Sequence, residues 1–468
     1  MRNCLDMLPM FQEKQKKKIT HFHTKGNKIH FISLGCPRNL VDSEVMLGIL
    51  LKAGYEPSEN LEDADYIVIN TCGFLQASRQ ESLDAINEAT SNRKEDARVI
   101  VTGCMVQIHS QEIKQLHPNI DYLLGSGDVE NILKAIESSS PGAEITSAKS
   151  YLEAGEIPRK LSTPQHYAYL KIAEGCRKHC AYCIIPNIKG KLKSKPIERI
   201  LKEFRLLLQG GAKEIILIAQ DLGDWGKDLG YRRTNGLIHL LKTLLKEKSE
   251  FCLRLLYLYP DEIDEELIDL IKNNPRICPY LDMPIQHVNN DLLKAMRRST
   301  TEEKILHTIS TLRKKLPEIT IRTSLIVGFP GESESQFKEL EQFIKKTSLD
   351  NVGIFKYSQE PGSHAANLPQ QISEKIKEKR YKKLMKIQKK IVEKNNKRFI
   401  GKKLQVIVEG YHPESKLLMT GRHQGQAPEI DGEIIINDGR AVQAFGQWHT
   451  VEITDSSGYD LVGRVLSV

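Results

Sequence analysis

The feature that most constrains the fold is a repeated alternation of short apolar runs with longer helical patterns. In the N-terminal part, runs rich in Ile and Val cover residues 28–35, 65–71 and 98–103, with helical patterns at residues 41–53 and 74–90. Strands that alternate with helices favour a parallel sheet with helices on both faces. The sequence therefore predicts a doubly wound α/β domain over residues 28–140, which ends in a loop at residues 138–142.

The same alternation continues through the middle of the chain. Six further predicted strands span residues 167–173, 214–219, 252–257, 280–285, 320–327 and 352–356. Six β/α units are fewer than the eight of a closed barrel. We therefore expect a partial (β/α)6 barrel within residues 162–395.

Both ends of the chain differ from this pattern. Residues 398–468 alternate apolar and polar side chains between Gly and Asp turns, which predicts a small all-β barrel. Residues 1–27 are rich in Lys and carry no hydrophobic pattern, so we expect a disordered tail there.

Composition excludes several classes of protein. Hydrophobic residues make up 40% and charged residues 27% of the 468 residues, which is typical of a globular protein. No apolar run approaches the roughly 18 residues of a membrane-spanning helix, and no signal peptide follows the N-terminal lysines. We expect a cytoplasmic protein. Nine cysteines are too few for a disulfide scaffold, so patterned cysteines indicate metal or catalytic ligands.

The net charge of +8 is unevenly distributed. Residues 371–398 hold twelve Lys or Arg and three Glu, a local charge of +9, whereas residues 399–468 carry six basic and nine acidic groups, a local charge of −3. The sequence predicts a long helix over residues 371–398. This basic helix presents either a solvated face or a surface attracted to a polyanion such as the ribosome.

The strongest local motif is Cys176-Arg-Lys-His-Cys180-Ala-Tyr-Cys183, which follows the first strand of the six-unit domain. Three thiolates at this spacing can bind three corners of a cubic iron–sulfur cluster, which leaves one iron open to a substrate or cofactor. Zinc is the alternative, but a structural zinc site requires four ligands, and His179 is the one candidate for the fourth.

A second set of three cysteines emerges only from the predicted fold. Cys36, Cys72 and Cys104 each follow a strand of the N-terminal sheet, at spacings of 36 and 32 residues. Loops at the carboxyl ends of neighbouring parallel strands converge on one crevice. Any one of the three taken alone would be a candidate buried core cysteine, but their common position predicts a shared site. The remaining cysteines, Cys4, Cys252 and Cys278, show no such relation and are expected to be unligated.

These motifs resemble those of the radical S-adenosylmethionine (SAM) superfamily, and within it the methylthiotransferases, whose C-terminal module is a TRAM domain. The resemblance covers residues 28–468. The segment ISLGCPRNLVDSE at residues 32–44 resembles the branch that modifies an aspartate of a ribosomal protein, whereas the tRNA-modifying branch usually has Gln-Met-Asn after the cysteine. Further matches to the first branch are AYLKIAEGC (168–176), AQD (219–221), PIQH (284–287), IVGFPGE (326–332) and APEIDG (427–432).

The resemblance implies two [4Fe–4S] clusters with different tasks. SAM would bind the open iron of the Cys176/Cys180/Cys183 cluster and be cleaved to a 5′-deoxyadenosyl radical, which removes a hydrogen from the β-carbon of an aspartate. The cluster on Cys36, Cys72 and Cys104 would hold the sulfur that is methylated and transferred. The cofactor supplies the radical chemistry, and the protein supplies orientation and excludes water.

Several residues at carboxyl strand ends are candidates for contacts with SAM or substrate, although turn geometry or core polarity also accounts for each. Tyr182 would pack on the adenine, Gln220 would bond the methionine part of SAM, and Arg322 would meet a carboxylate. The remaining candidates are Gln286, His287 and Gly328, the last because glycine permits close backbone approach.

The resemblance also implies partners. The substrate would be the twelfth protein of the small ribosomal subunit, with RNA contact through the ribosome and a flavodoxin or ferredoxin as electron donor. An acidic C-terminal module suits a basic ribosomal protein better than RNA, since phosphate contacts require cations. The candidate contacts are three carboxylates that we expect to be exposed, Glu429, Asp431 and Glu433. The alternatives are a tRNA (adenosine) methylthiotransferase and a non-enzymatic iron–sulfur or RNA-binding protein.

Overall fold

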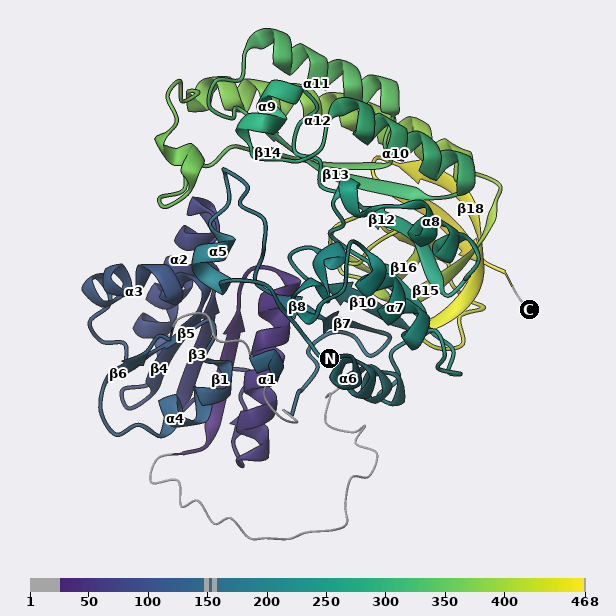
Figure 1. Ribbon diagram of the computed structural model, residues 1–468. Coiled ribbons are helices and arrows are strands. Elements are labelled where there is room, and N and C mark those ends of the chain that lie inside the picture. Colours follow the sequence, from purple (N-terminus) through teal and green to yellow (C-terminus); the bar gives the residue numbers. More distant parts are fainter. Residues whose placement is uncertain (1–25, 147–150, 154–157, 467–468) are drawn as a thin grey trace.

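The computed structural model describes residues 26–146, 151–153 and 158–466. The predicted tail at residues 1–27 lies outside them except for its last two residues, and so does Cys4. Three units follow one another along the chain, from an N-terminal α/β domain through a central α/β domain to a C-terminal β-barrel (Figure 1). Among the described residues, no helix has the length and apolar character needed to cross a membrane.

The N-terminal domain contains a six-stranded parallel sheet in the order β2-β1-β3-β4-β5-β6. Its strands are β1 (Lys28–Ser33), β2 (Glu56–Pro57), β3 (Tyr66–Thr71), β4 (Arg98–Gly103), β5 (Tyr122–Gly125) and β6 (Gly142–Glu144). This is a doubly wound order. After β1 the chain adds β2 on one side, and it then returns past β1 to add β3 and the later strands on the other side. The sheet extends through β6, beyond the expected end of the domain at residue 140.

Helices cover both faces of this sheet. They are α1 (Pro37–Lys52), α2 (Gln76–Asn92), α3 (Cys104–Leu116) and α4 (Ile132–Glu137). One apolar cluster joins the sheet to α1 and α4, and another joins it to α2 and α3. Every residue of β3 is buried, as expected of a parallel strand covered on both faces.

The central domain contains a second parallel sheet, in the order β14-β13-β12-β11-β10-β7. Its strands are β7 (Tyr167–Lys171), β10 (Glu214–Ile218), β11 (Cys252–Leu255), β12 (Ile277–Asp282), β13 (Thr320–Val327) and β14 (Asn351–Lys356). The first and last strands, β7 and β14, are the two edges of the sheet, so the barrel is open as predicted.

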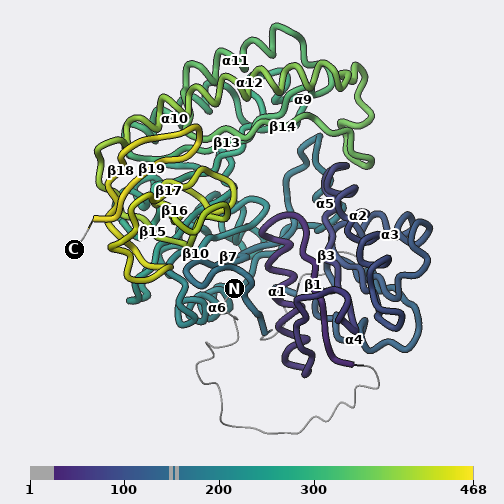
Figure 2. Tube along the Cα trace, turned by 180° about the vertical axis from the view of Figure 1, so that it is seen from behind, coloured from purple at the N-terminus to yellow at the C-terminus, as the bar shows by residue number. Residues whose placement is uncertain are grey.

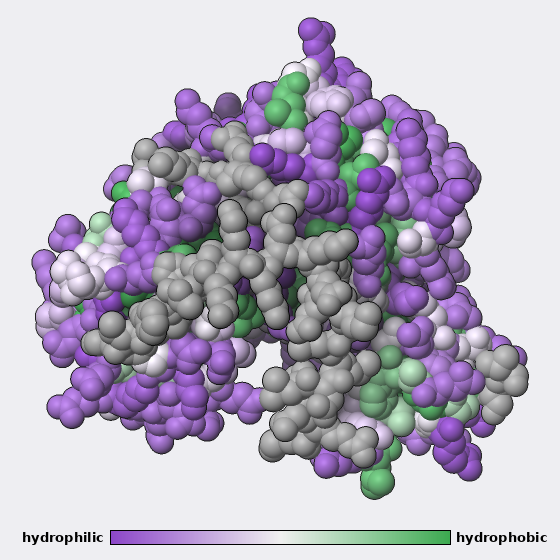
Figure 3. Space-filling model, turned by 90° about the horizontal axis from the view of Figure 1, so that it is seen from below, coloured by the Kyte–Doolittle hydropathy of each residue, from purple (hydrophilic) through white to green (hydrophobic). Residues whose placement is uncertain are grey.

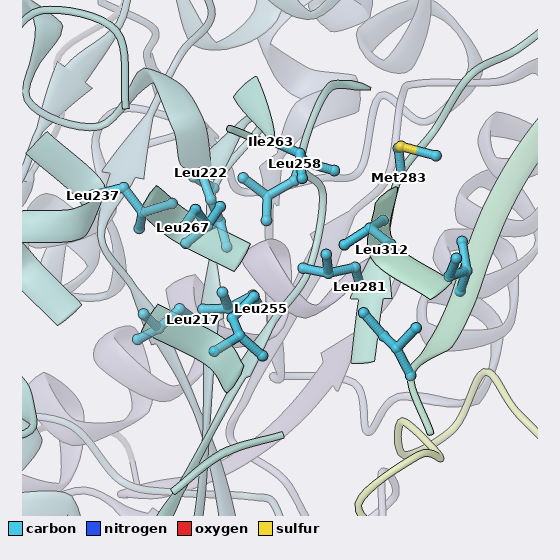
Figure 4. Packing of buried hydrophobic residues seen from close by; sticks show 14 of the residues in the cluster. Leu217, Leu222, Leu237, Leu255, Leu258, Ile263, Leu267, Leu281, Met283 and Leu312 are labelled. Atoms are coloured by element: carbon cyan, nitrogen blue, oxygen red, sulfur yellow. The ribbon is translucent and has the colours of Figure 1, made fainter. Parts of the chain in front are cut away.

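Helices line the outer face of this partial barrel. They are α6 (Ile197–Gln209), α7 (Asn235–Leu244), α8 (Glu265–Lys272), α9 (Asn290–Ala295), α10 (Glu302–Lys315), α11 (Glu334–Thr347) and α12 (Glu374–Asn396). Figure 4 shows the Leu-rich core between sheet and helices, with Leu217 and Leu255 on neighbouring strands and Leu237 and Leu267 on the helices that cover them.

One predicted strand of this sheet is displaced. The sequence predicts a strand at residues 280–285, but β12 begins at Ile277 and ends at Asp282. The register with β11 shifts from Leu253↔Ile277 to Leu255↔Leu281, which makes a bulge around Pro279. A proline has no N–H to donate to the ladder, and a bulge accommodates it in a central strand.

The C-terminal unit is a closed five-stranded barrel in the order β15-β16-β17-β19-β18. Its strands are β15 (Lys403–His412), β16 (Ser415–His423), β17 (Ile434–Asp438), β18 (Gln447–Ser457) and β19 (Asp460–Val465). The long basic helix α12 leads into it, as expected. The closed barrel confirms the prediction of a small all-β module.

The central domain lies between the other two, as Figures 1 and 2 show from opposite sides. One buried cluster joins all three units through Val41 of α1, Tyr169 of β7 and Ala427 of the loop between β16 and β17. Where described side chains are visible in Figure 3, hydrophilic residues cover most of the lower face. The N-terminal domain and the β-barrel therefore both pack against the central domain.

Candidate active site: two sets of three cysteines

The first set of cysteines lies on the loop between β8 (Ala173–Glu174) and α5 (Ile185–Lys189), beyond the carboxyl end of β7. The backbone amides of Lys178 and Ile185 point at the sulfurs of Cys176 and Cys183, each at 3.4 Å. The hydroxyl of Tyr259 lies 3.1 Å from the sulfur of Cys180. Donors from the loop itself and from Tyr259, beyond β11, thus lie beside the sulfurs and favour thiolates.

The thiols of this set hinder one another's ionisation. Burial raises the pKa of Cys176 to about 11, and the neighbouring Cys180 adds to the increase. Burial likewise raises the pKa of Cys183 to about 12, with Cys180 and Cys176 adding to it. Three adjacent thiolates, of which Cys180 is buried and the other two are partly exposed, need a cationic centre. Iron supplies one, so this donor set fits a cluster with three cysteine ligands.

The second set lies at the carboxyl ends of three adjacent strands, β1, β3 and β4. Cys36 is the N-cap of α1, Cys72 directly follows β3, and Cys104 opens α3. Burial raises the pKa of Cys104 to about 12, and the nearby thiols of Cys36 and Cys72 also raise it. The structure therefore brings together the three cysteines that the sequence predicted to meet, at the reversal point of the sheet where ligands bind in such folds.

A glycine makes this convergence possible. Gly35 has a φ of +92°, and a Cβ built on it would lie 2.9 Å from the Cβ of Cys72. Any side chain would therefore be strained and would collide with the cysteine. The side chain of Asn39 fixes the same loop by donating to the carbonyl of Leu34 at 2.6 Å.

Arg38 lies where the two sets face each other. It follows Cys36 by two residues, and its Nη1 crosses to the central domain to donate to the carbonyl of Ala219 at 2.9 Å. Burial disfavours ionisation of Cys36, but Arg38 and nearby backbone amides outweigh it and lower the pKa of that thiol. The charge of Arg38 also acts to lower the pKa of Cys183 in the other set, although burial dominates there. One guanidinium is thus close to both sets.

A buried ionic network holds the two domains together beside this interface. Asp42 of α1 pairs with Lys171 of β7 and, at 3.1 Å, with Lys189 of α5. Glu174 pairs with the same Lys189 at 2.9 Å. All four side chains are at most 5% exposed, so the distance between the two cysteine sets is fixed by packing as well as charge.

Two of the predicted cofactor residues lie close to the first set. Gln220 follows β10, and its Oε1 is buried without a hydrogen-bond partner among the described residues. An acceptor left without a donor fits the amino group of a ligand. Tyr182 is half-buried and packs on a cluster that includes Ala181 and Phe329.

Three other predicted cofactor residues have clear structural roles. His287 is fully buried, with its Nδ1 accepting from the amide of Asn289 at 3.0 Å and its Nε2 3.4 Å from Glu332. Gly328 adopts a φ of +75° and donates its amide to the same Glu332. Gln286 has a φ of 72° and bonds β13 through its backbone. The sequence did not single out Glu332, which also pairs with Arg380 at 2.7 Å.

The predicted substrate carboxylates differ in accessibility. Glu429 is exposed and accepts from the hydroxyl of Tyr167 at 2.8 Å, and the side chain of Glu433 is 36% exposed. The expectation of an exposed group is wrong for Asp431, whose side chain is 1% exposed and pairs with Arg322 at 3.3 Å. Arg322 is therefore already paired with a carboxylate of this chain, because the loop between β16 and β17 enters the open barrel.

Sequence reasoning also missed an aromatic support under the first set. The ring of Tyr259 lies between Lys178, whose Nζ is 3.7 Å from the ring centroid, and Arg298, whose Cζ is 3.8 Å from it. Its hydroxyl reaches Cys180. These residues are 81 and 39 positions apart in the sequence, so no local motif reveals the contact. Cys252 and Cys278, in contrast, interact with each other and belong to neither set.

Comparison with known proteins agrees with this architecture. Three family models match in order: "Uncharacterized protein family UPF0004" over residues 28–125, the radical SAM superfamily over residues 170–344 and the TRAM domain over residues 400–466. The fold is similar to that of the radical SAM methyltransferase TsrM from Kitasatospora setae, with a TM-score of 0.51 and 13% identity over 71% of this chain and 72% of that one. Fold and site thus define a radical SAM enzyme, a class that uses SAM and a [4Fe–4S] cluster.

Curated relatives narrow the class. The chain is 67% identical to the ribosomal protein uS12 methylthiotransferase RimO of Protochlamydia amoebophila, over 95% of this chain and 94% of the relative. It is 44% identical to the RimO of Geobacter sulfurreducens, over 94% of this chain and 99% of the relative. The chain belongs to the RimO family of radical SAM methylthiotransferases, which confirms the predicted family and enzyme class.

Proposed function

We propose that the protein transfers a methylthio group to the β-carbon of an aspartate in ribosomal protein uS12, and that it does so with two [4Fe–4S] clusters. The observation that carries this proposal is the position of the two cysteine sets on either side of one packed domain interface. The relatives named as acting on uS12 support the substrate. The tRNA alternative has no comparable support, because its motif after the first cysteine is absent.

Each cysteine set has its own task in this proposal. Cys176, Cys180 and Cys183 would hold the cluster that binds SAM, and Cys36, Cys72 and Cys104 the cluster that carries the transferred sulfur. When bound, SAM and the first cluster supply a radical able to remove hydrogen from an unactivated carbon. The protein positions the substrate between the two sites and keeps water away.

Other residues of the chain orient these groups. Gln220 offers a buried acceptor for the amino group of SAM, and Tyr182 offers a ring for its adenine. Gln286, His287 and Gly328 shape the same strand ends through the contacts described above. Arg322 acts on the reaction indirectly, because it holds the loop of Asp431 inside the barrel.

Partners follow from the same proposal. An enzyme that modifies ribosomal protein uS12 would act in the cytoplasm. It would contact RNA only through the ribosome. A flavodoxin or ferredoxin would supply electrons to the SAM-binding cluster. Glu429 and Glu433 remain the candidate contacts for the basic substrate on the C-terminal barrel, since only these two of the three predicted carboxylates are accessible.

The division of labour is tested by cysteine variants after anaerobic reconstitution. The wild type should bind about eight irons, four per cluster. Cys72→Ala should lose the N-terminal cluster yet still cleave SAM, whereas Cys180→Ala should lose SAM cleavage. Cys252→Ala, a buried cysteine outside both sets, is the matched control and should keep all the iron. Identical behaviour of Cys72→Ala and Cys180→Ala would contradict the two-site assignment.

A further inference from the structure

We propose that Arg38 binds the side-chain carboxylate of the substrate aspartate and so selects an acidic side chain for modification. This inference rests on the proposed function, and it names the residue that recognises the reacting group. It starts from the position of Arg38, which belongs to the N-terminal domain but extends into the mouth of the central barrel.

Two contacts establish that position. The Nη1 of Arg38 donates to the carbonyl of Ala219, the residue that follows β10, at 2.9 Å. The guanidinium carbon lies 5.1 Å from the ring centroid of Tyr257, two residues beyond the end of β11. Both neighbours lie at carboxyl ends of barrel strands, where ligands of β/α barrels bind. The cation is therefore held at the point where substrate must pass between the two cysteine sets.

Arg38, like Arg298 beside Cys180, has no carboxylate partner among the described residues, whereas the other cations near the interface do. Lys171 and Lys189 pair with Asp42, and Arg322 pairs with Asp431. Within residues 26–146, 151–153 and 158–466, no carboxylate oxygen lies within 4.0 Å of the Arg38 guanidinium. The neighbours that can become anionic are the sulfurs of Cys36 and Cys104, both proposed cluster ligands, and the hydroxyl of Tyr257.

A half-buried cation that faces no carboxylate favours an anionic ligand, because the Cys36 sulfur that partly compensates its desolvation here is itself a proposed cluster ligand. A guanidinium presents several N–H donors in one plane and binds a carboxylate through two parallel hydrogen bonds. The carbonyl of Ala219 and the ring of Tyr257 hold this plane in place. The donors that remain can therefore receive a carboxylate in a fixed orientation.

This arrangement places the right carbon at the reaction site. In an aspartate the β-carbon is bonded directly to the carboxylate carbon, so anchoring the carboxylate fixes the β-carbon within one bond length. Hydrogen removal and sulfur transfer both occur at that carbon in the proposed function. A fixed carboxylate between the two cysteine sets would hold the carbon in reach of both without a large movement of the substrate.

The experiment compares Arg38→Met, which removes the charge at similar length, with Arg38→Lys and with Arg205→Met as the matched control. Arg205 is an exposed arginine of α6 on the outer face of the barrel. Mass spectrometry of uS12 treated with wild-type enzyme first identifies the modified aspartate. Fluorescence anisotropy then measures binding of two peptides to each reconstituted protein, one with that aspartate and one with asparagine in its place. Iron content is measured in parallel.

Wild type should bind the aspartate peptide about ten- to a hundredfold more tightly than the asparagine peptide, the range for a hydrogen bond to a charged group. Arg38→Met should remove this preference, with the asparagine peptide bound as before, while Arg38→Lys should retain part of it and Arg205→Met all of it. If wild type shows no preference, the inference is overturned even without the variants. If Arg38→Met methylthiolates uS12 fully, this inference is overturned and the proposed function stands. If the wild type modifies no aspartate of uS12, the proposed function is overturned as well.

Discussion

Glu214→Gln should loosen the attachment of the C-terminal barrel to the central domain. Glu214 on β10 is 1% exposed and accepts from Arg254 of β11 and, at 3.0 Å, from Arg422 of β16. Arg254 in turn donates to the carbonyl of Gln424 in the C-terminal barrel at 2.9 Å. The carboxylate therefore joins two buried cations, one from each unit.

The expected size of the effect follows from what the substitution leaves behind. Gln keeps the shape but removes the charge, so Arg254 loses its one carboxylate partner among the described residues, while Arg422 keeps Glu409 at 2.8 Å. Removing one partner of a buried ion pair costs about 3–5 kcal/mol. A cost of about 4 kcal/mol raises the population of the detached state roughly a thousandfold.

Hydrogen–deuterium exchange of the loop between β16 and β17 measures this population, because the loop packs against the central domain and detachment exposes it. Glu452→Gln is the control within the same barrel, since Glu452 pairs with Arg464 at 2.7 Å but the two side chains are 26% and 55% exposed. An exposed pair contributes at most about 1 kcal/mol. Equal exchange in Glu214→Gln and Glu452→Gln would refute the claim that the buried network holds the barrel in place.

Three further predictions follow from named contacts. Although burial favours the neutral acid, Arg254 and Arg422 hold the pKa of Glu214 at about 2 instead of 4.5. The stabilisation is present above pH 4.5 and lost as the pH falls toward 2. The protection of the loop between β16 and β17, corrected for the pH dependence of intrinsic amide exchange, should therefore fall over that range in wild type and not in Glu214→Gln. Tyr259→Phe removes a hydrogen bond to the Cys180 sulfur. Loss of a bond that contributes about 1 kcal/mol should lower the reduction potential of the SAM-binding cluster by on the order of 50 mV, measured by EPR titration. An unchanged potential would show that the bond is absent in the loaded enzyme. Cys278→Ala should retain full iron content, and loss of a cluster would show that a ligand is misassigned.

The sequence predicted the parts of this structure that depend on local patterns. The strand ends that carry Cys36, Cys72 and Cys104 could be located because each follows a run of Ile and Val, and parallel strands align their carboxyl ends. The motif around Cys176 is contiguous and needs no fold to be recognised. In both cases the residues that matter lie within a few positions of a recognisable element.

Contacts between distant segments were not predictable in the same way. The residues around Asp431 have the composition of an exposed turn. The loop that carries Asp431 nevertheless enters the barrel, where Asp431 pairs with Arg322, 109 positions earlier in the sequence. The strand β12 contains Pro279. Proline normally lies on an edge strand or at the first position of a strand, and here a bulge accommodates it in a central strand. In each case the outcome depends on tertiary packing that the local sequence does not record.

The central claim is tested most directly by mass spectrometry of uS12 after incubation with the anaerobically reconstituted protein, SAM, sulfide and a reductant. The account predicts the added mass of one methylthio group, located on the side chain of an aspartate and absent when either Cys72→Ala or Cys180→Ala replaces the wild type. Unmodified uS12, or a methylthio group found on an adenosine of tRNA instead, would contradict it.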